Sequence, residues 1–228
     1  MTHSDRLTRL KAATQKGIQL SIGTLTGDMM NQANDLNILE EQGIELLHLD
    51  VMDGTIWPKI SVGPGFLGGL NTSLLKDVHL LTSTPEKHIA GFVGAGADII
   101  TVQIEDCDNA GAALDEIKEA GVLASAGIYP TTPYEELESV LDKCDVVFLL
   151  SIGPTTGKDT FFDKVYERIE KIRASHPDIV IAIDGAVKVN NIGELAAQKP
   201  DLIVTGSAVF DGVDPVGNIA KMKEAIAQ

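Results

Sequence analysis

The sequence predicts an α/β protein of the (β/α)8 (TIM) barrel class. Three observations lead to this prediction: eight short apolar runs, an amphipathic stretch between most successive runs, and a length of 228 residues, when such barrels commonly need about 200 to 250. Runs that are apolar on both faces and followed by crossover helices are typical of a parallel sheet covered by helices. A doubly wound open sheet is the alternative arrangement.

The eight predicted strands lie near residues 18–22, 45–50, 77–81, 98–104, 122–128, 145–151, 179–184 and 202–207. Amphipathic segments such as "NQANDLNILEEQG", "NAGAALDEIKEAG" and "FFDKVYERIEKIRASHP" separate them, and Gly or Pro near several of their ends marks helix stops. No linker-like or low-complexity stretch divides the chain. We therefore expect one domain over residues 1–228, with a short N-terminal extension of about residues 1–16.

Charge and composition restrict the partners. The chain has 18 basic and 33 acidic side chains, a formal charge of −15, which opposes attraction to nucleic acid or anionic membranes. The N-terminus is polar and no apolar run approaches the length of a membrane span. Cys107 and Cys144 form no CxxC pair, so we expect a reducing, cytoplasmic location. We expect neither nucleic-acid nor membrane partners.

Polar side chains gather where predicted strands end. In "HLDVMDG", His48 and Asp50 are two residues apart, so both point to the same face of one strand. The third strand ends with His79 in "DVHLL", and the seventh with Asp184 in "AIDGAV". Strand ends carry the catalytic groups of a barrel, and imidazole with carboxylate suits a divalent metal. The first pair alone fits a packed histidine equally well, whereas the four strand ends together favour a metal site.

The last two strand ends predict a phosphate site. They carry "DGAV" at 184–187 and "TGSAVF" at 205–210, and phosphate sites in this architecture often use the loops after strands 7 and 8. Gly185 and Gly206 allow close backbone approach, and Ser207 offers a hydroxyl. Taken singly, each glycine is more typical of a tight turn.

Four sequence blocks now carry a resemblance. "HLDVMDG", "DVHLLTSTP", "AIDGAVKVNNIGEL" and "DLIVTGSAVF" resemble, in order and spacing, the signatures of the ribulose-phosphate 3-epimerase family, from about residue 18 to residue 211. The resemblance implies a barrel of the ribulose-phosphate-binding type. It also implies a homo-oligomeric isomerase of carbohydrate metabolism, in the pentose phosphate context, that inverts carbon 3 of a ketose phosphate.

The resemblance also implies roles for individual residues. One divalent metal ion (zinc, iron, manganese or cobalt) would bind His48, Asp50, His79 and Asp184. Asp50 and Asp184 would be the acid/base pair on opposite faces of the substrate, acting through a metal-stabilised enediolate. Substrate and phosphate contacts are expected from Ser21, Met52, Thr155, Thr156, Gly157, Lys158, Gly185, Ala186, Gly206 and Ser207.

Several positions depart from the family pattern. Gly23 stands where the family usually has serine, Gln103 replaces a usual histidine and Lys59 replaces a usual asparagine. The sixth-strand loop, "LLSIGPTTGKD", lacks most of the usual glycine-rich stretch. These changes predict a ketose phosphate other than ribulose 5-phosphate.

Two alternatives remain open. Related-barrel sugar-phosphate decarboxylases, which are lyases, carry an Asp-x-Lys-x-x-Asp motif, and the matching "DVMDG" has no lysine. The altered sixth loop would also permit a noncatalytic sugar-phosphate-binding protein. Two opposed aspartates argue against this second alternative, because binding alone requires no acid/base pair.

Overall fold

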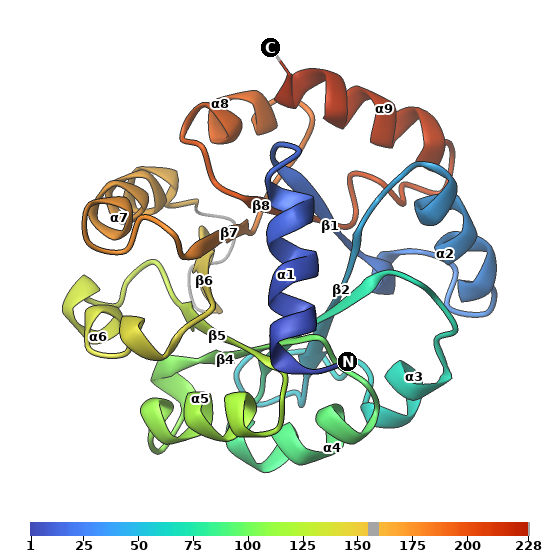
Figure 1. Ribbon diagram of the computed structural model, residues 1–228. Coiled ribbons are helices and arrows are strands. Elements are labelled where there is room, and N and C mark those ends of the chain that lie inside the picture. Colours follow the sequence, from blue (N-terminus) through green and yellow to red (C-terminus); the bar gives the residue numbers. More distant parts are fainter. Residues whose placement is uncertain (155–159, 228) are drawn as a thin grey trace.

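The computed structural model describes residues 1–154 and 160–227, and its strands form one closed parallel barrel in chain order (Figure 1). The prediction of a (β/α)8 barrel is confirmed, and the open-sheet alternative is wrong. The strands are β1 (Gln19–Gly23), β2 (Leu46–Met52), β3 (Leu75–Leu81), β4 (Ile99–Gln103), β5 (Leu123–Ile128), β6 (Val146–Leu150), β7 (Val180–Asp184) and β8 (Leu202–Thr205).

A helix follows each strand and covers the outside of the barrel. These helices are α2 (Gln32–Glu41), α3 (Pro64–Gly69), α4 (Ile89–Gly94), α5 (Ala110–Glu119), α6 (Tyr134–Glu138), α7 (Phe162–Ser175), α8 (Ile192–Ala197) and α9 (Pro215–Ile226). The described helices include none with the length and apolar character needed to cross a membrane.

The strands are apolar because both of their faces are buried. Every residue of β4, β5 and β6 is buried. One set of side chains packs outward against the helices, and the alternating set fills the barrel. The inward residues near the strand starts are aliphatic, whereas those near the strand ends of β2, β3 and β7 include the polar residues of the site. The inward side chains therefore stabilise the barrel at the end where the strands begin and form the candidate site at the end where they finish.

The N-terminal extension is a helix, α1 (His3–Thr14), that lies across one end of the barrel (Figure 1). A capping box starts it: the Thr2 hydroxyl accepts a hydrogen bond from the Asp5 amide, and the Asp5 carboxylate accepts one from the Thr2 amide. Leu10 is fully buried and belongs to the same apolar cluster as Leu46 and Ile99, the first inward residues of β2 and β4. The extension thus closes the end of the barrel where the strands begin.

Polar contacts hold α1 in this position. Arg6 donates to Asp98 over 2.9 Å and to the carbonyl of Gly121 over 2.9 Å. His3 Nε2 lies 2.9 Å from an Asp145 carboxylate oxygen. The Asp98 carboxylate also accepts a hydrogen bond from the backbone amide of Lys76 in β3. The Asp145 carboxylate accepts one from the backbone amide of Ala124 in β5. The helix is therefore tied to the same carboxylates that order the strand starts.

We predict that Leu10→Ala lowers the free energy of unfolding by about 2–5 kcal/mol, as for other fully buried leucines. The exposed Thr8 on the same helix provides the control, and Thr8→Ala should change that free energy by less than about 0.5 kcal/mol. Urea denaturation followed by circular dichroism measures both. Equal effects of the two substitutions would mean that α1 does not pack on the barrel in solution.

Candidate active site

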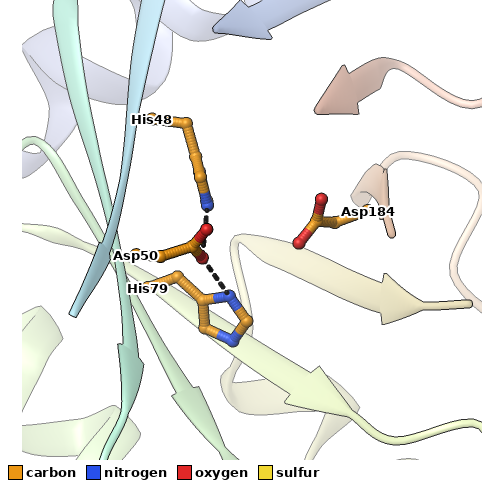
Figure 2. A group of neighbouring side chains, drawn as sticks. All are labelled: His48, Asp50, His79 and Asp184. Atoms are coloured by element: carbon orange, nitrogen blue, oxygen red, sulfur yellow. Dashed lines mark hydrogen bonds and ion pairs between the residues drawn. The ribbon is translucent and has the colours of Figure 1, made fainter. Parts of the chain in front are cut away.

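Four side chains predicted from strand ends meet at the carboxyl end of the barrel. His48 and Asp50 come from β2, His79 from β3 and Asp184 from β7 (Figure 2). Each offers one nitrogen or oxygen atom, and these atoms lie within 4.8 Å of one another. Asp50 and His79 are direct partners in the β2–β3 register, while Asp184 approaches from the opposite side. The four predicted residues form one cluster.

The two carboxyl groups of the cluster differ electrostatically. Burial favours the neutral form of Asp50, but the neighbouring His48 and His79 outweigh it and lower the pKa of Asp50. For Asp184, burial and the nearby Asp50 carboxylate together raise its pKa to about 6. Burial disfavours the charged form of His48, yet Asp77 and Asp50 raise the pKa of His48 above its usual range. Without a cation, the site thus holds one ionised carboxylate and one that takes up a proton far more readily.

The donor set of this cluster fits a divalent metal ion. His79 is fully buried, and its Nδ1 atom, 3.5 Å from Asp50 Oδ1, has no hydrogen-bond partner among residues 1–154 and 160–227. A buried polar atom without a partner is costly, and a cation among the four residues would satisfy it. His48 Nε2 also faces Asp50 Oδ1, at 3.1 Å. Two imidazole nitrogens and two carboxylates are ligands that divalent transition metals accept.

Phe148 of β6 supports both histidines from inside the barrel. Its ring stacks on His48 with 5.4 Å between centroids, and it lies 4.6 Å from the His79 ring at a tilt of 52°. Phe148 is itself buried. Phe148 thereby packs against both imidazoles, which restricts their rotation. Phe148 was not predicted as a site residue, because an apolar residue in a buried strand carries no functional signal.

A cavity of about 280 Å³ opens beside the cluster. Of the residues predicted to contact substrate, those that line it are Met52, Gly185, Ala186, Gly206 and Ser207. Ser21 does not line the cavity: it is fully buried and donates to Asp77 over 3.0 Å. The structure thus places Ser21 below the site, because it lies two residues before the strand end. The predicted contacts at Thr155, Thr156, Gly157 and Lys158 lie outside the described residues.

At two glycines of the predicted phosphate site, neighbouring atoms leave little room for a side chain. A Cβ atom on Gly206 would lie 3.1 Å from the carbonyl oxygen of Gly23, and one on Gly185 would lie 2.8 Å from Ser151 Oγ. Gly185 and Ala186 both have positive φ angles, 105° and 53°, so the chain turns sharply after Asp184. The segment after β8 therefore runs against the end of β1, and the segment after β7 runs against the residues that follow β6.

Several residues that line the cavity were not predicted as contacts, among them Trp57, Lys59 and Lys188. Lys188 donates to the Ser207 hydroxyl over 2.7 Å, which joins the loops after β7 and β8. A lysine in a loop has no periodic signal and is usually exposed, so only its position in "DGAVKV" could have indicated it. Gln103 was noted as a departure but is not a cavity residue; it is fully buried against His79.

Comparison of folds places the chain among (β/α)8 barrels. Its structure is similar to 3-hexulose-6-phosphate synthase from Salmonella typhimurium, with a TM-score of 0.66 at 16% identity over 92% of this chain and 99% of that one. It is equally similar to tryptophan synthase subunit alpha from Legionella pneumophila, with a TM-score of 0.66 at 14% identity over 100% and 99% of the two chains. At these identities the likeness concerns the fold alone.

Sequence comparison is more specific. The model of the ribulose-phosphate 3 epimerase family matches residues 18–210. The chain is 35% identical to ribulose-phosphate 3-epimerase from Escherichia coli strain K12, over 90% of this chain and 94% of that one. It is 31% identical to the enzyme of that name from Bacillus subtilis, over 90% and 98% of the two chains. Together with the four clustered strand-end residues, these matches show that the chain belongs to the ribulose-phosphate 3-epimerase family.

Proposed function

We propose that this protein is a metal-dependent 3-epimerase of a ketose phosphate. The observation that carries the proposal is the placement of Asp50 and Asp184 on opposite sides of one cation-binding cluster at the cavity floor. Inversion of a carbon next to a carbonyl requires a proton to leave one face and another to arrive on the opposite face. Two opposed carboxyl groups meet this requirement.

The residues divide the reaction as follows. One of the two aspartates removes the proton from carbon 3, and the other returns a proton on the far face. His48 and His79, with both aspartates, would hold the divalent ion. When bound, that ion stabilises the negative charge that develops on the substrate oxygens, which is worth several kcal/mol of the barrier.

The phosphate group would bind between the loops after β7 and β8. Gly185, Ala186 and Gly206 bring backbone amides to this side of the cavity, and Ser207 adds a hydroxyl. Lys188 supplies a cation there, in a protein whose formal charge is −15. A local positive charge against that background attracts a phosphate ester. Binding at this end orients carbon 3 toward the two aspartates.

The donor set, the cysteines and the family also bear on the metal, the location and the oligomeric state of the protein. The donor set suits zinc, iron, manganese or cobalt. The free cysteines, Cys107 and Cys144, agree with a reducing, cytoplasmic location. Family membership supports a homo-oligomeric enzyme with no nucleic-acid partner.

The two alternative functions have less support. At the strand end that carries lysine in the related decarboxylases, this chain has Met52, which lines the cavity. A noncatalytic sugar-phosphate-binding protein would need neither Asp50 nor Asp184 beside its ligand, yet both line the cavity.

A panel of ketose phosphates tests the proposal and its substrate. The enzyme should catalyse exchange of the carbon 3 hydrogen with solvent deuterium, observed by proton NMR, on at least one pentulose, tetrulose or hexulose phosphate. The departures at Gly23 and Lys59 predict that ribulose 5-phosphate is not preferred. A kcat/KM for ribulose 5-phosphate more than about tenfold above the others would contradict that preference. No exchange with any ketose phosphate, despite bound metal, would favour the noncatalytic alternative.

A further inference from the structure

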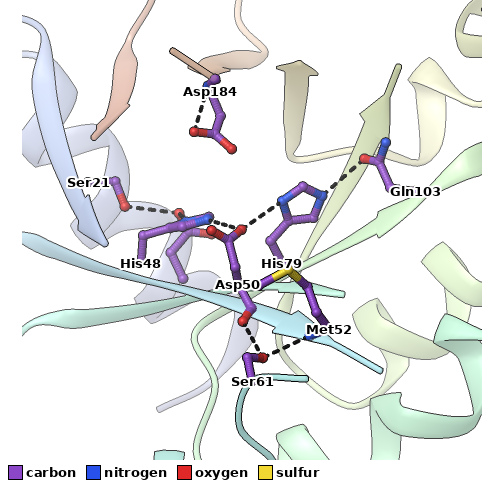
Figure 3. A network of polar contacts seen from close by, with 10 residues as sticks. Ser21, His48, Asp50, Met52, Ser61, His79, Gln103 and Asp184 are labelled. Carbon is purple, nitrogen blue, oxygen red and sulfur yellow. Dashed lines mark hydrogen bonds and ion pairs between the residues drawn. The ribbon is translucent and has the colours of Figure 1, made fainter. Parts of the chain in front are cut away.

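Each histidine of the cluster has a buried partner outside the four-residue cluster, and Figure 3 shows Gln103 on the side of the His79 ring away from Asp50. His48 Nδ1 lies 2.8 Å from Oδ2 of Asp77, which is 2% exposed. His79 Nε2 lies 3.1 Å from Oε1 of Gln103, which is 0% exposed. Neither Asp77 nor Gln103 lines the cavity. Both therefore act on the site only through the histidines.

These partners determine which ring nitrogen carries the proton. An imidazole that binds a metal ion must be neutral, and a neutral imidazole has one N–H and one lone pair. A carboxylate or an amide oxygen only accepts, so His48 donates through Nδ1 to Asp77, and His79 donates through Nε2 to Gln103. The lone pairs that remain are on His48 Nε2 and His79 Nδ1, the two atoms that face Asp50. The two histidines thus present different nitrogens to the cluster.

The carboxylate partner is held by a second buried group. Ser21 of β1, 0% exposed, donates to Asp77 Oδ2 over 3.0 Å, and this is the oxygen that His48 contacts. The hydroxyl gives the buried Asp77 carboxylate a further hydrogen-bond donor. Ser21, Asp77 and His48 form a continuous hydrogen-bonded chain from β1 through β3 to β2.

The amide partner is held by its contact with His79 and by the space beside Gly127. Gln103 Nε2 has no hydrogen-bond partner in the described residues, so the contact with His79 is the one that orients the amide. Gly127 lies beside Gln103 in the β4–β5 register. A Cβ atom on Gly127 would lie 1.7 Å from Gln103 Oε1 and 2.8 Å from its Cδ. The Gln103 side chain therefore occupies space that only glycine leaves.

We propose that Asp77 and Gln103 are positioning residues that select the metal-facing nitrogens of His48 and His79, with Ser21 and Gly127 holding them in place. The inference rests on the metal cluster of the proposed function but not on the substrate or on turnover. Outer partners of metal-binding histidines typically contribute about 10- to 100-fold in metal affinity. The effect is therefore measured as cation binding.

Cobalt binding to the whole protein tests this proposal. Affinity for Co²⁺ would be measured by competition with a chelating dye, and the visible absorption spectrum of the bound ion would report its ligands. Asp77→Asn and Gln103→Ala should each weaken binding about 10- to 100-fold and shift the spectrum. Gln103→Glu keeps an acceptor toward His79 and should bind at least as tightly as the unmodified protein. Ser21→Ala should weaken binding less than Asp77→Asn does.

Thr101 provides a matched control. It is fully buried, lies two residues before Gln103 on β4, and its hydroxyl has no hydrogen-bond partner in the described residues. Thr101→Val should leave both the affinity and the spectrum unchanged. Circular dichroism of each metal-free variant separates loss of binding from loss of fold.

A double-mutant cycle tests the role of Gly127. If Gly127 acts by leaving room for Gln103, then Gly127→Ala weakens Co²⁺ binding in the unmodified protein but adds nothing to Gln103→Ala. Additive effects would remove Gly127 from the proposal.

The outcomes separate this inference from the proposed function. Folded Asp77→Asn and Gln103→Ala variants that bind Co²⁺ within about threefold of the unmodified protein would overturn the inference and leave the epimerase proposal standing. An unmodified protein that binds no Co²⁺ would overturn both. Normal Co²⁺ binding without turnover of any ketose phosphate would overturn only the proposed function.

Discussion

Replacement of either Asp50 or Asp184 by asparagine should reduce net epimerisation by about 10²- to 10⁴-fold, the usual contribution of a positioned acid or base. The two carboxyl groups belong to one cluster, in which the ligand atoms lie within 4.8 Å of one another, and approach from opposite sides. An amide can neither accept nor return the proton. Inversion at carbon 3 therefore fails when the carboxyl group on either face of the substrate is missing.

Isotope exchange distinguishes this two-residue mechanism from simple damage. With one aspartate removed, the other can still take a proton from its own face and return it there. Asp50→Asn should therefore exchange the carbon 3 hydrogen of one epimer with solvent, and Asp184→Asn that of the other, without interconverting them. Because both residues are also expected to be ligands, metal content must be measured in the same samples. A metal-loaded single variant that still epimerises efficiently would disprove the assignment.

Removal of the metal ion should lower epimerisation nearly as much as replacement of Asp50 or Asp184. Stabilisation of developing charge by a cation is worth several kcal/mol, so dialysis against a strong chelator should lower kcat about 10³-fold. Addition of one equivalent per chain of zinc, iron, manganese or cobalt should restore it, and the ion that restores most identifies the preferred metal.

The control for metal removal is a measurement that the metal-free protein is still folded. The two apolar clusters of the barrel contain none of the four cluster residues, so circular dichroism should show that the stripped protein remains folded. Undiminished turnover by folded protein without bound metal, confirmed by elemental analysis, would exclude the cation from the reaction.

The strands and the four cluster residues were predictable because each has a local signal. A buried strand is an apolar run, and His48 and Asp50 share a face because side chains alternate along it. His79 and Asp184 follow from the rule that parallel strands end at one rim. The same rule could have indicated Asp77, which lies two residues before His79 and also points inward.

Other features depend on contacts between distant segments and have no local signal. The role of Gln103 depends on the absence of a side chain at Gly127, one strand away. Lys188 joins the site through a bond to Ser207, nineteen residues later. The amphipathic character of α1 is weak, and its position is explained only by partners such as Asp98 and Asp145. Tertiary structure alone assigns these roles.

The docking of α1 also constrains when the barrel can be completed during synthesis. The helix leaves the ribosome before the strands do, but Arg6 must wait for Asp98, 92 residues later, and His3 for Asp145, 142 residues later. At about 5–20 residues per second, this delay is on the order of ten seconds. A helix of 12 residues is marginally stable alone. The nascent chain therefore carries Leu10 and the apolar strand starts uncovered at least until Asp145 emerges, and full cover requires β8, which closes the barrel against β1.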